Sequence, residues 1–240
     1  MGLDFSKHFE KYEKFLKQLD SIFERMQKEY PEEIKCRQGC TDCCYALFDL
    51  HLVEALYLNH KFGSLDQDER NRILIDADKA DRKAHKLKKN MAKASSKDGR
   101  DNEELLGRVS QERLRCPLLR DDDKCALYEF RPATCRLYGL PLDIDGETHT
   151  CGKTGFVTGE KYPTVKMRNV HENLARMSQE MAADIGSSYK QLHTLLLPVS
   201  TALLTEFDAE YLGIKEDEKP LEHVTSTPKG TDDWVIGGGE

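Results

Sequence analysis

The chain has 240 residues, of which 38% are hydrophobic and 33% are charged. This length is enough for one domain with its own core, and no apolar run approaches the roughly 20 residues that a membrane-spanning helix needs. Lys and Arg number 36 against 43 Asp and Glu, which gives a formal net charge of -7. This acidic balance argues against binding of nucleic acid or anionic lipid over the whole surface, so any basic site has to be local.

Two stretches in the N-terminal half have the spacing of amphipathic helices. In residues 5 to 30, apolar side chains recur every three or four positions, and Pro31 ends the pattern. Residues 73 to 94 repeat this spacing with an alanine-rich face, which would let an aromatic-rich helix approach closely. We expect the two helices to pair antiparallel within the domain, and an intermolecular coiled coil is the alternative.

Between these two stretches, residues 42 to 61 are apolar on nearly all sides, which predicts a mostly buried helix. Thr41 and Asp42 are good N-cap residues, so the helix should begin there and carry Cys43 and Cys44 in its first turn. A helix N-terminus favours the thiolate, which is the form of cysteine that binds metal. Neighbouring side chains diverge by about 100° on a helix, so these two thiols need not serve the same centre.

Three more helices are predicted after residue 100, over residues 101 to 113, 170 to 192 and 199 to 212. Residues 214 to 240 lose this periodicity and end in a glycine run, so we expect a disordered tail. The predicted fold class is mainly α. It is a helical bundle in a single metal-binding domain, residues 1 to 213, with an irregular cysteine-rich segment and a small β-hairpin.

The stretch from residue 114 to residue 160 is interrupted by prolines and glycines and is predicted to be irregular. An acidic turn after Cys116 predicts a hairpin, in which Tyr128 should pack. The Arg131-Pro132 step should open a short helix that brings Cys135 inward, with the arginine contacting a thiolate or a carbonyl.

A basic run between residues 79 and 100 carries nine lysines and arginines. It could contact phosphates or an acidic protein partner, but such a run is more often the solvated face of a helix. No aromatic residue is interleaved for base stacking, which argues against nucleic acid.

The most informative count is eight cysteines, all of them between Cys36 and Cys151. The N-terminus has no apolar signal segment, so we expect a cytoplasmic protein whose thiols stay reduced. Clustered reduced thiols indicate a metal site, and His149 is an alternative to the remote Cys151. The candidate metal ligands are Cys36, Cys40, Cys43, Cys44, Cys116, Cys125, Cys135 and Cys151.

We expect the two groups of cysteines, 36 to 44 and 116 to 151, to converge, because the loops that carry the second group lack a core and need a metal to order them. Eight thiolates would saturate two tetrahedral all-cysteine zinc sites, or one four-iron cluster with four cysteines left for a second centre or for reaction. The irregular spacings depart from the CxxC pairs of zinc ribbons and favour an iron–sulfur cluster of the 4Fe-4S type, with zinc as the alternative. Flanking arginines and lysines would offset the thiolate charge.

The motif Cys36-x3-Cys40-x2-Cys43-Cys44, followed by Cys116-Pro-Leu-Leu, Cys125-Ala-Leu-Tyr and Arg131-Pro132-x2-Cys135-Arg136, resembles a known family. It is similar to the zinc- or iron-chelating cysteine-cluster family of the YkgJ type, which shares its CxxxCxxCC signature with the flagellin lysine-N-methylases. The resemblance covers residues 36 to 151. It implies that seven cysteines bind zinc or an iron–sulfur cluster, namely Cys36, Cys40, Cys43, Cys44, Cys116, Cys125 and Cys135.

Three functions are compatible with these residues. The first is a metal-binding protein, non-catalytic or electron-carrying, whose cysteine centre organises a helical domain. The second is an enzyme that resembles the lysine methylases and uses S-adenosylmethionine, although no glycine-rich loop after a strand is present to hold that cofactor. The third is a zinc-stabilised interaction module that uses the basic helix or the tail. Whether the protein is an enzyme, and its oligomeric state, are left open.

Overall fold

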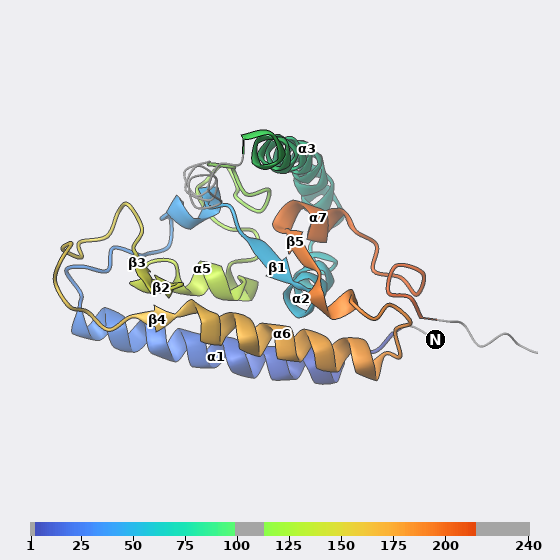
Figure 1. Cartoon of the computed structure of the whole chain (residues 1–240), viewed down its shortest axis with the longest axis horizontal. Coiled ribbons are helices and arrows are strands. Elements are labelled where there is room, and N and C mark those ends of the chain that lie inside the picture. Colours follow the sequence, from blue (N-terminus) through green and yellow to red (C-terminus); the bar gives the residue numbers. More distant parts are fainter. Residues whose placement is uncertain (1–2, 99–112, 215–240) are drawn as a thin grey trace, which may run out of the picture.

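The computed structural model describes residues 3 to 98 and 113 to 214, and it is mainly α with two small sheets, as the sequence predicts (Figure 1). The helices are α1 (Ser6–Glu29), α2 (Leu52–Phe62), α3 (Gln67–Asp98), α5 (Ala133–Leu137), α6 (Met167–Asp184) and α7 (Val199–Leu204). The strands are β1 (Asp49–His51), β2 (Leu142–Ile144), β3 (Glu147–His149), β4 (Val165–Lys166) and β5 (Leu196–Pro198). Short 3-10 turns are η1 (Asp42–Tyr45), η2 (Tyr128–Phe130) and η3 (Leu192–Thr194).

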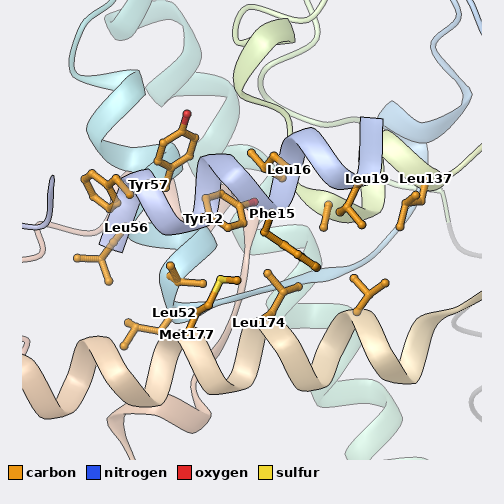
Figure 2. Packing of buried hydrophobic residues seen from close by; sticks show 14 of the residues in the cluster. Tyr12, Phe15, Leu16, Leu19, Leu52, Leu56, Tyr57, Leu137, Leu174 and Met177 are labelled. Carbon is orange, nitrogen blue, oxygen red and sulfur yellow. The ribbon is translucent and has the colours of Figure 1, made fainter. Parts of the chain in front are cut away.

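Helices α1 and α6 lie side by side and run in opposite directions along one edge of the molecule (Figure 1). Their exposed edges are joined by ion pairs from Lys7 to Asp184 and from Lys11 to Glu180. Between them, aromatic and aliphatic side chains of α1 face the apolar side chains of α6 (Figure 2). The first predicted helix is thus confirmed almost to the residue, because its apolar spacing fits one buried stripe.

Helix α2 is buried on nearly all sides, as predicted, and it joins two hydrophobic cores. Leu52 and Leu56 belong to a first core with α1, α5 and α6, whereas Leu58 and Phe62 belong to a second core with α3 and α7. The carboxylate of Glu54 ties the first core together, because it accepts hydrogen bonds from the Tyr12 hydroxyl, the Ala133 amide and the His51 amide, each at 3.1 Å.

The predicted pairing of the first helix with the alanine-rich helix is wrong. Helix α3 packs on α7, whereas α1 packs on α2, α5 and α6. The alanine-rich face of α3 does permit a close approach, but the helix that packs there is α7. The Ser200 and Thr201 hydroxyls of α7 donate to Asp81 Oδ1 of α3 at 3.2 and 2.6 Å. The aromatic face of α1 is already covered by α2 and α6, so the expected partner has no room there.

The predicted start of the helix over residues 42 to 61 is also wrong. Residues Asp42–Tyr45 form only a 3-10 turn, Thr41 makes no side-chain cap, and the α-helix begins ten residues later at Leu52. The intervening backbone pairs with other segments, since the Cys44 and Tyr45 carbonyls accept the amides of Cys116 and Leu114. A proper cap exists at His51, whose ring and whose amide exchange hydrogen bonds with Glu54.

Two small sheets complete the fold. Strand β1 pairs antiparallel with β5, and β2 lies between antiparallel β3 and parallel β4. The β2–β3 hairpin turns at Asp145 and Gly146, which both have positive φ angles, of 52° and 91°. The predicted hairpin after Cys116 is present as a tight turn with a single β-bridge between Leu119 and Cys125.

The later helices are shorter than predicted. Helix α6 ends at Asp184, because Gly186 adopts a left-handed φ of 64° and closes the helix. Helix α7 ends at Leu204, where the Asn59 side chain donates to the carbonyls of Ala202 and Thr205. Residues 101 to 112 of the predicted helix over 101 to 113, and the tail after residue 214, lie outside the described residues. Within the described ranges, no helix is both long and apolar enough to cross a membrane.

Candidate metal centre

A cavity of about 320 Å³ between the C-terminal half of α1, the turn before η1 and α5 collects cysteines from distant parts of the sequence. We call it the thiol cavity. It is lined by five of the eight predicted ligands, Cys36, Cys40, Cys43, Cys135 and Cys151. The expected convergence of the two cysteine groups is therefore seen for these five residues.

Cys36 and Cys40 are placed by a tight turn, in which the Cys40 amide donates to the Arg37 carbonyl at 2.9 Å. Gly39 has a φ of 87°, a conformation that glycine adopts without strain. Gly139 then makes room for the first thiol, because a Cβ atom at position 139 would lie 2.1 Å from Cys36 Sγ. The end of α5 is thus shaped around this sulfur.

Cys43 and Cys44 lie in the 3-10 turn η1, and their thiols hydrogen-bond to each other. This hydrogen bond, followed by burial, raises the pKa of Cys43. The divergence expected from a helical start therefore does not keep the two sulfurs apart. Of this pair, only Cys43 lines the thiol cavity.

Cys116 and Cys125 flank the acidic turn and pack against the second core. The Cys116 amide donates to the Cys44 carbonyl at 2.7 Å, which fastens this loop directly to η1. The Ala126 amide donates to the Leu118 carbonyl at 2.8 Å, which closes the hairpin and holds Cys125 opposite Leu119. Backbone hydrogen bonds thus join Cys116 to the doubled cysteine and keep Cys125 in the same hairpin.

Cys135 lies on α5, which Pro132 opens as the sequence predicts. The preceding Arg131 stacks its guanidinium 3.7 Å from the Tyr128 ring centre and donates from Nε to the Tyr128 carbonyl at 2.9 Å. Its positive charge lowers the pKa values of Cys36, Cys43 and other thiols against the larger effects of burial. Arg131 thus contacts a carbonyl, which is one of the two contacts predicted for it, and both Arg131 and Tyr128 line the thiol cavity.

Cys151 reaches the thiol cavity because its loop is fastened to the segment before Cys36. The Gly155 amide and the Thr154 hydroxyl both donate to the Glu33 carbonyl, at 2.7 and 3.2 Å. His149, the predicted alternative, lies on the exposed strand β3 and lines a neighbouring cavity instead. The structure therefore places Cys151, and not His149, beside the other thiols.

The mutual effects of the thiols on their pKa values divide them into two sets. We call Cys43, Cys116, Cys125 and Cys135 the inner set. Burial raises the pKa of Cys116 to about 12 and that of Cys135 well above its ordinary value; Cys125 and Cys43 raise the pKa of Cys116 further, and Cys43, Cys116 and Cys125 raise that of Cys135. The four thiols, which come from η1, the hairpin after Cys116 and α5, thus lie in one neighbourhood.

The outer set consists of Cys36, Cys40 and Cys151. Burial raises the pKa of Cys36 to about 12, and Cys151 and Cys40 are the next causes, followed by Cys43 of the inner set, which lies beside both sets. Cys36 and Cys40 also line a second hollow of about 540 Å³, together with the cations Lys35, Arg37 and Lys153. The outer set is therefore reached from two sides, whereas two members of the inner set are packed against a core.

The residues present fit a thiophilic metal. Seven thiols in two sets are soft donors, which suit zinc or iron–sulfur chemistry, and position 139 is kept free of a Cβ that would collide with one of them. Among residues 3 to 98 and 113 to 214, no three Cys, His, Asp or Glu side chains stand close enough to hold an ion without moving. Closing either set on a metal therefore requires rotation about the single χ1 angle of each cysteine.

Sequence reasoning missed several residues of the site. Asp42 is one of them: it was predicted as a helix cap, but it lines the thiol cavity and pairs with Arg113 at 2.7 Å. A neighbouring cavity of about 740 Å³ carries a pair of histidines, His51 and His171, whose ring nitrogens lie 3.1 Å apart. The position of Asp42 inside the cysteine motif was the available signal, whereas nothing in the sequence links the two histidines.

Comparison with known proteins agrees with the geometry of the thiols. Residues 35–152 match the protein-family model CxxCxxCC, whose description is a putative zinc- or iron-chelating domain. Neither the curated proteins nor the solved structures give a significant match. Residues 35–152 of the chain thus match the CxxCxxCC family, which is described as a putative zinc- or iron-chelating domain.

Proposed function

We propose that this protein binds metal at two adjacent centres and that the inner one holds its fold together. The inner centre would use the four thiolates of the inner set. The outer centre would use Cys36, Cys40 and Cys151 and would serve electron transfer. The bound metal is zinc or an iron–sulfur cluster, and it supplies a cross-link between thiolates or, in the iron form, an exchangeable electron.

The observation that carries this proposal is the position of the thiols between two cores. Cys36 packs against the core of α1, α2 and α6, whereas Cys116 and Cys125 pack against the core of α2, α3 and α7. The segment between residues 113 and 160 contains few regular elements, but it contributes buried side chains to both cores, Leu118 and Leu127 to one and Ala133, Leu137 and Leu140 to the other. A metal held by thiolates from both sides would cross-link the two cores and add to this packing.

The surroundings of each set support a division of roles. Cys116 and Cys125 of the inner set pack against the second core, which suits a closed, four-coordinate centre with no free position, whereas Cys43 and Cys135 line the thiol cavity. The outer set borders two cavities and several cations, so a partner could approach it. Electron exchange falls with distance, so we assign the redox role to the outer set.

The experiment is anaerobic purification of the full chain, followed by metal and sulfide analysis and an absorption spectrum. Iron and sulfide with broad visible absorption would identify an iron–sulfur protein, whereas a colourless, zinc-loaded chain would identify zinc and exclude the redox role. A chain that retains less than one metal per molecule after anaerobic reconstitution with either metal would refute the proposal.

Matched cysteine variants test the two centres. We expect Cys135→Ser to lose the inner metal and much of the folding stability, because it removes a ligand between the cores. Cys40→Ser should lose only the outer metal and keep the fold. Single Cys43→Ser and Cys44→Ser variants complete the series, and equal loss of the same metal from both would contradict a special role for Cys43 in the inner set.

The two alternatives from the sequence make different predictions. A methylase-like enzyme would bind S-adenosylmethionine, so saturable binding of that cofactor to the metal-loaded chain would favour it. An interaction module would lose its partner when a chelator unfolds it, without any redox change. The open outer cavity is compatible with the first alternative, and no described residue favours the second.

A further inference from the structure

We infer that Asp42 supplies the fourth ligand of the outer centre, through its carboxylate oxygen Oδ2. The outer centre would then hold an iron or zinc ion between three thiolates and one carboxylate, and only the iron form could carry an electron. This inference rests on the proposed metal-binding function, and it names a ligand of different chemistry from the cysteines.

The first argument is the fixed position of the Asp42 side chain. The Arg113 guanidinium donates to Asp42 Oδ1 at 2.7 Å and to the Asp42 carbonyl at 3.1 Å. Arg113 also lies over the Tyr45 ring, 5.8 Å from its centre. One carboxylate oxygen is thus held by an arginine, which is how carboxylate ligands of metals are commonly oriented.

The second argument is the other carboxylate oxygen. Asp42 Oδ2 is buried and has no hydrogen-bond partner among the described residues, and the side chain is only 13% exposed. Buried charged oxygens are nearly always paired, so an unpaired one needs an explanation. A cation at this oxygen would provide it.

The third argument is the set of groups that surround this carboxylate. Asp42 lines the thiol cavity together with all three members of the outer set. Groups that carry negative charge as ligands thus face one another across the cavity, an arrangement that a divalent cation between them would stabilise.

The fourth argument is the ligand count. The inner set takes four of the eight cysteines and the outer set takes three, so a four-coordinate outer centre lacks one donor. Cys44 is the remaining cysteine, but its sulfur is hydrogen-bonded to Cys43, and among the described residues it is not part of the cavity wall. Asp42 is on that wall, so it is the better-placed donor.

The test is a Co²⁺ titration of the reduced, metal-free full chain, with Zn²⁺ competition to measure affinity. Asp42→Asn keeps the size of the side chain and removes the charge, and Asp42→Cys replaces the oxygen donor by sulfur. The matched control is Asp121→Asn, which removes an exposed aspartate that pairs with Arg115 at 3.4 Å in the same cysteine-rich segment. All four chains are compared for folding by circular dichroism before metal is added.

We expect Asp42→Asn to weaken binding of the second Co²⁺ by at least about tenfold and to leave the first unchanged. Asp42→Cys should restore binding and increase the sulfur-to-cobalt charge-transfer absorption of the second equivalent by one thiolate. The Asp121→Asn control should match the wild type. A folded Asp42→Asn chain with wild-type affinity for both equivalents, or an Asp42→Cys spectrum identical to the wild type, would overturn the inference. A wild-type chain that binds neither Co²⁺ nor Zn²⁺ would instead overturn the proposed function.

Discussion

Replacement of Gly139 by alanine should disturb one metal centre through a single methyl group. A Cβ atom at this position would lie 2.1 Å from Cys36 Sγ and 3.3 Å from Cys36 Cβ. Carbon and sulfur atoms normally pack at about 3.5 to 4 Å, so Cys36 must move its sulfur by more than 1 Å. Gly139 is buried at the end of α5, so the backbone has little room to give way.

The expected cost of Gly139→Ala has two parts. Overpacking of a buried position typically destabilises a protein by about 1 to 3 kcal/mol. For a chain of this size, that corresponds to a fall in melting temperature of roughly 2 to 10 °C. In addition, the displaced Cys36 sulfur should leave the outer set, which should weaken that metal by at least about tenfold.

Gly152→Ala is the matched control, because a Cβ there would meet no atom within 4 Å although the residue directly follows Cys151. Thermal unfolding of the metal-free chains measures the first effect, and metal stoichiometry under Zn²⁺ competition measures the second. If Gly139→Ala melts and binds two metals as Gly152→Ala does, then neither the tight contact at Cys36 nor its role in the outer set is correct.

Three other measurements test the electrostatics and the metal. The pKa of His51 is lowered to about 4, first by burial and then by His171, so the unfolded chain binds more protons between pH 4 and 6.5. The free energy of unfolding should therefore fall as the pH drops through that window, by about 1 kcal/mol once the effect is reduced for the partial exposure of His51. Urea titrations should show a smaller loss in the His171→Gln variant. Asp20→Ala should destabilise the chain by about 1 to 3 kcal/mol, because it leaves the buried Arg136 guanidinium without its carboxylate partner. The control Asp78→Ala, which removes an exposed ion pair with Arg82, should cost less than about 0.5 kcal/mol in the same urea assay. A chelator should lower the unfolding midpoint of the wild type, and an unchanged midpoint would contradict a structural role for the metal.

Much of the fold was predictable because it depends on local pattern. The apolar stripe over residues 5 to 30 encodes α1, and the run after residue 50 encodes a buried helix wherever it begins. The beginning was not predictable, because it depends on distant backbone. The carbonyl groups after Cys43 are taken by residues 114 and 116, which no local signal announces. The predicted pairing of α1 with α3 was wrong for the same reason. The alanine face of α3 fits several helices, and α1 was already covered.

The site was predictable in its residues but not in its grouping. Spacing marked all eight cysteines, yet the division into two sets results from hairpin and loop contacts that join residues more than 70 positions apart. Asp42 was predicted only as a helix cap, and the role of Gly139 beside Cys36 was not predicted, because both roles depend on atoms across the cavity. Cavity-lining residues of this kind carry no periodic signal, so only the packed chain reveals them.

Fewer basic residues are available to offset the thiolate charge at the centres than the sequence indicates. Basic residues flank both cysteine groups, but most of those on the second group are already engaged: Arg113, Arg120 and Arg136 pair with Asp42, Glu69 and Asp20. Arg131 is different, because it faces thiols of both sets while it stacks on Tyr128. Four thiolates around a divalent cation carry a net charge of about -2, so one arginine offsets only part of it.

The inner centre should therefore stay negative, and the cations beside Cys36 and Cys40 leave the outer centre as the less negative of the two. A less negative centre accepts an electron more readily, which agrees with placing electron transfer at the outer set.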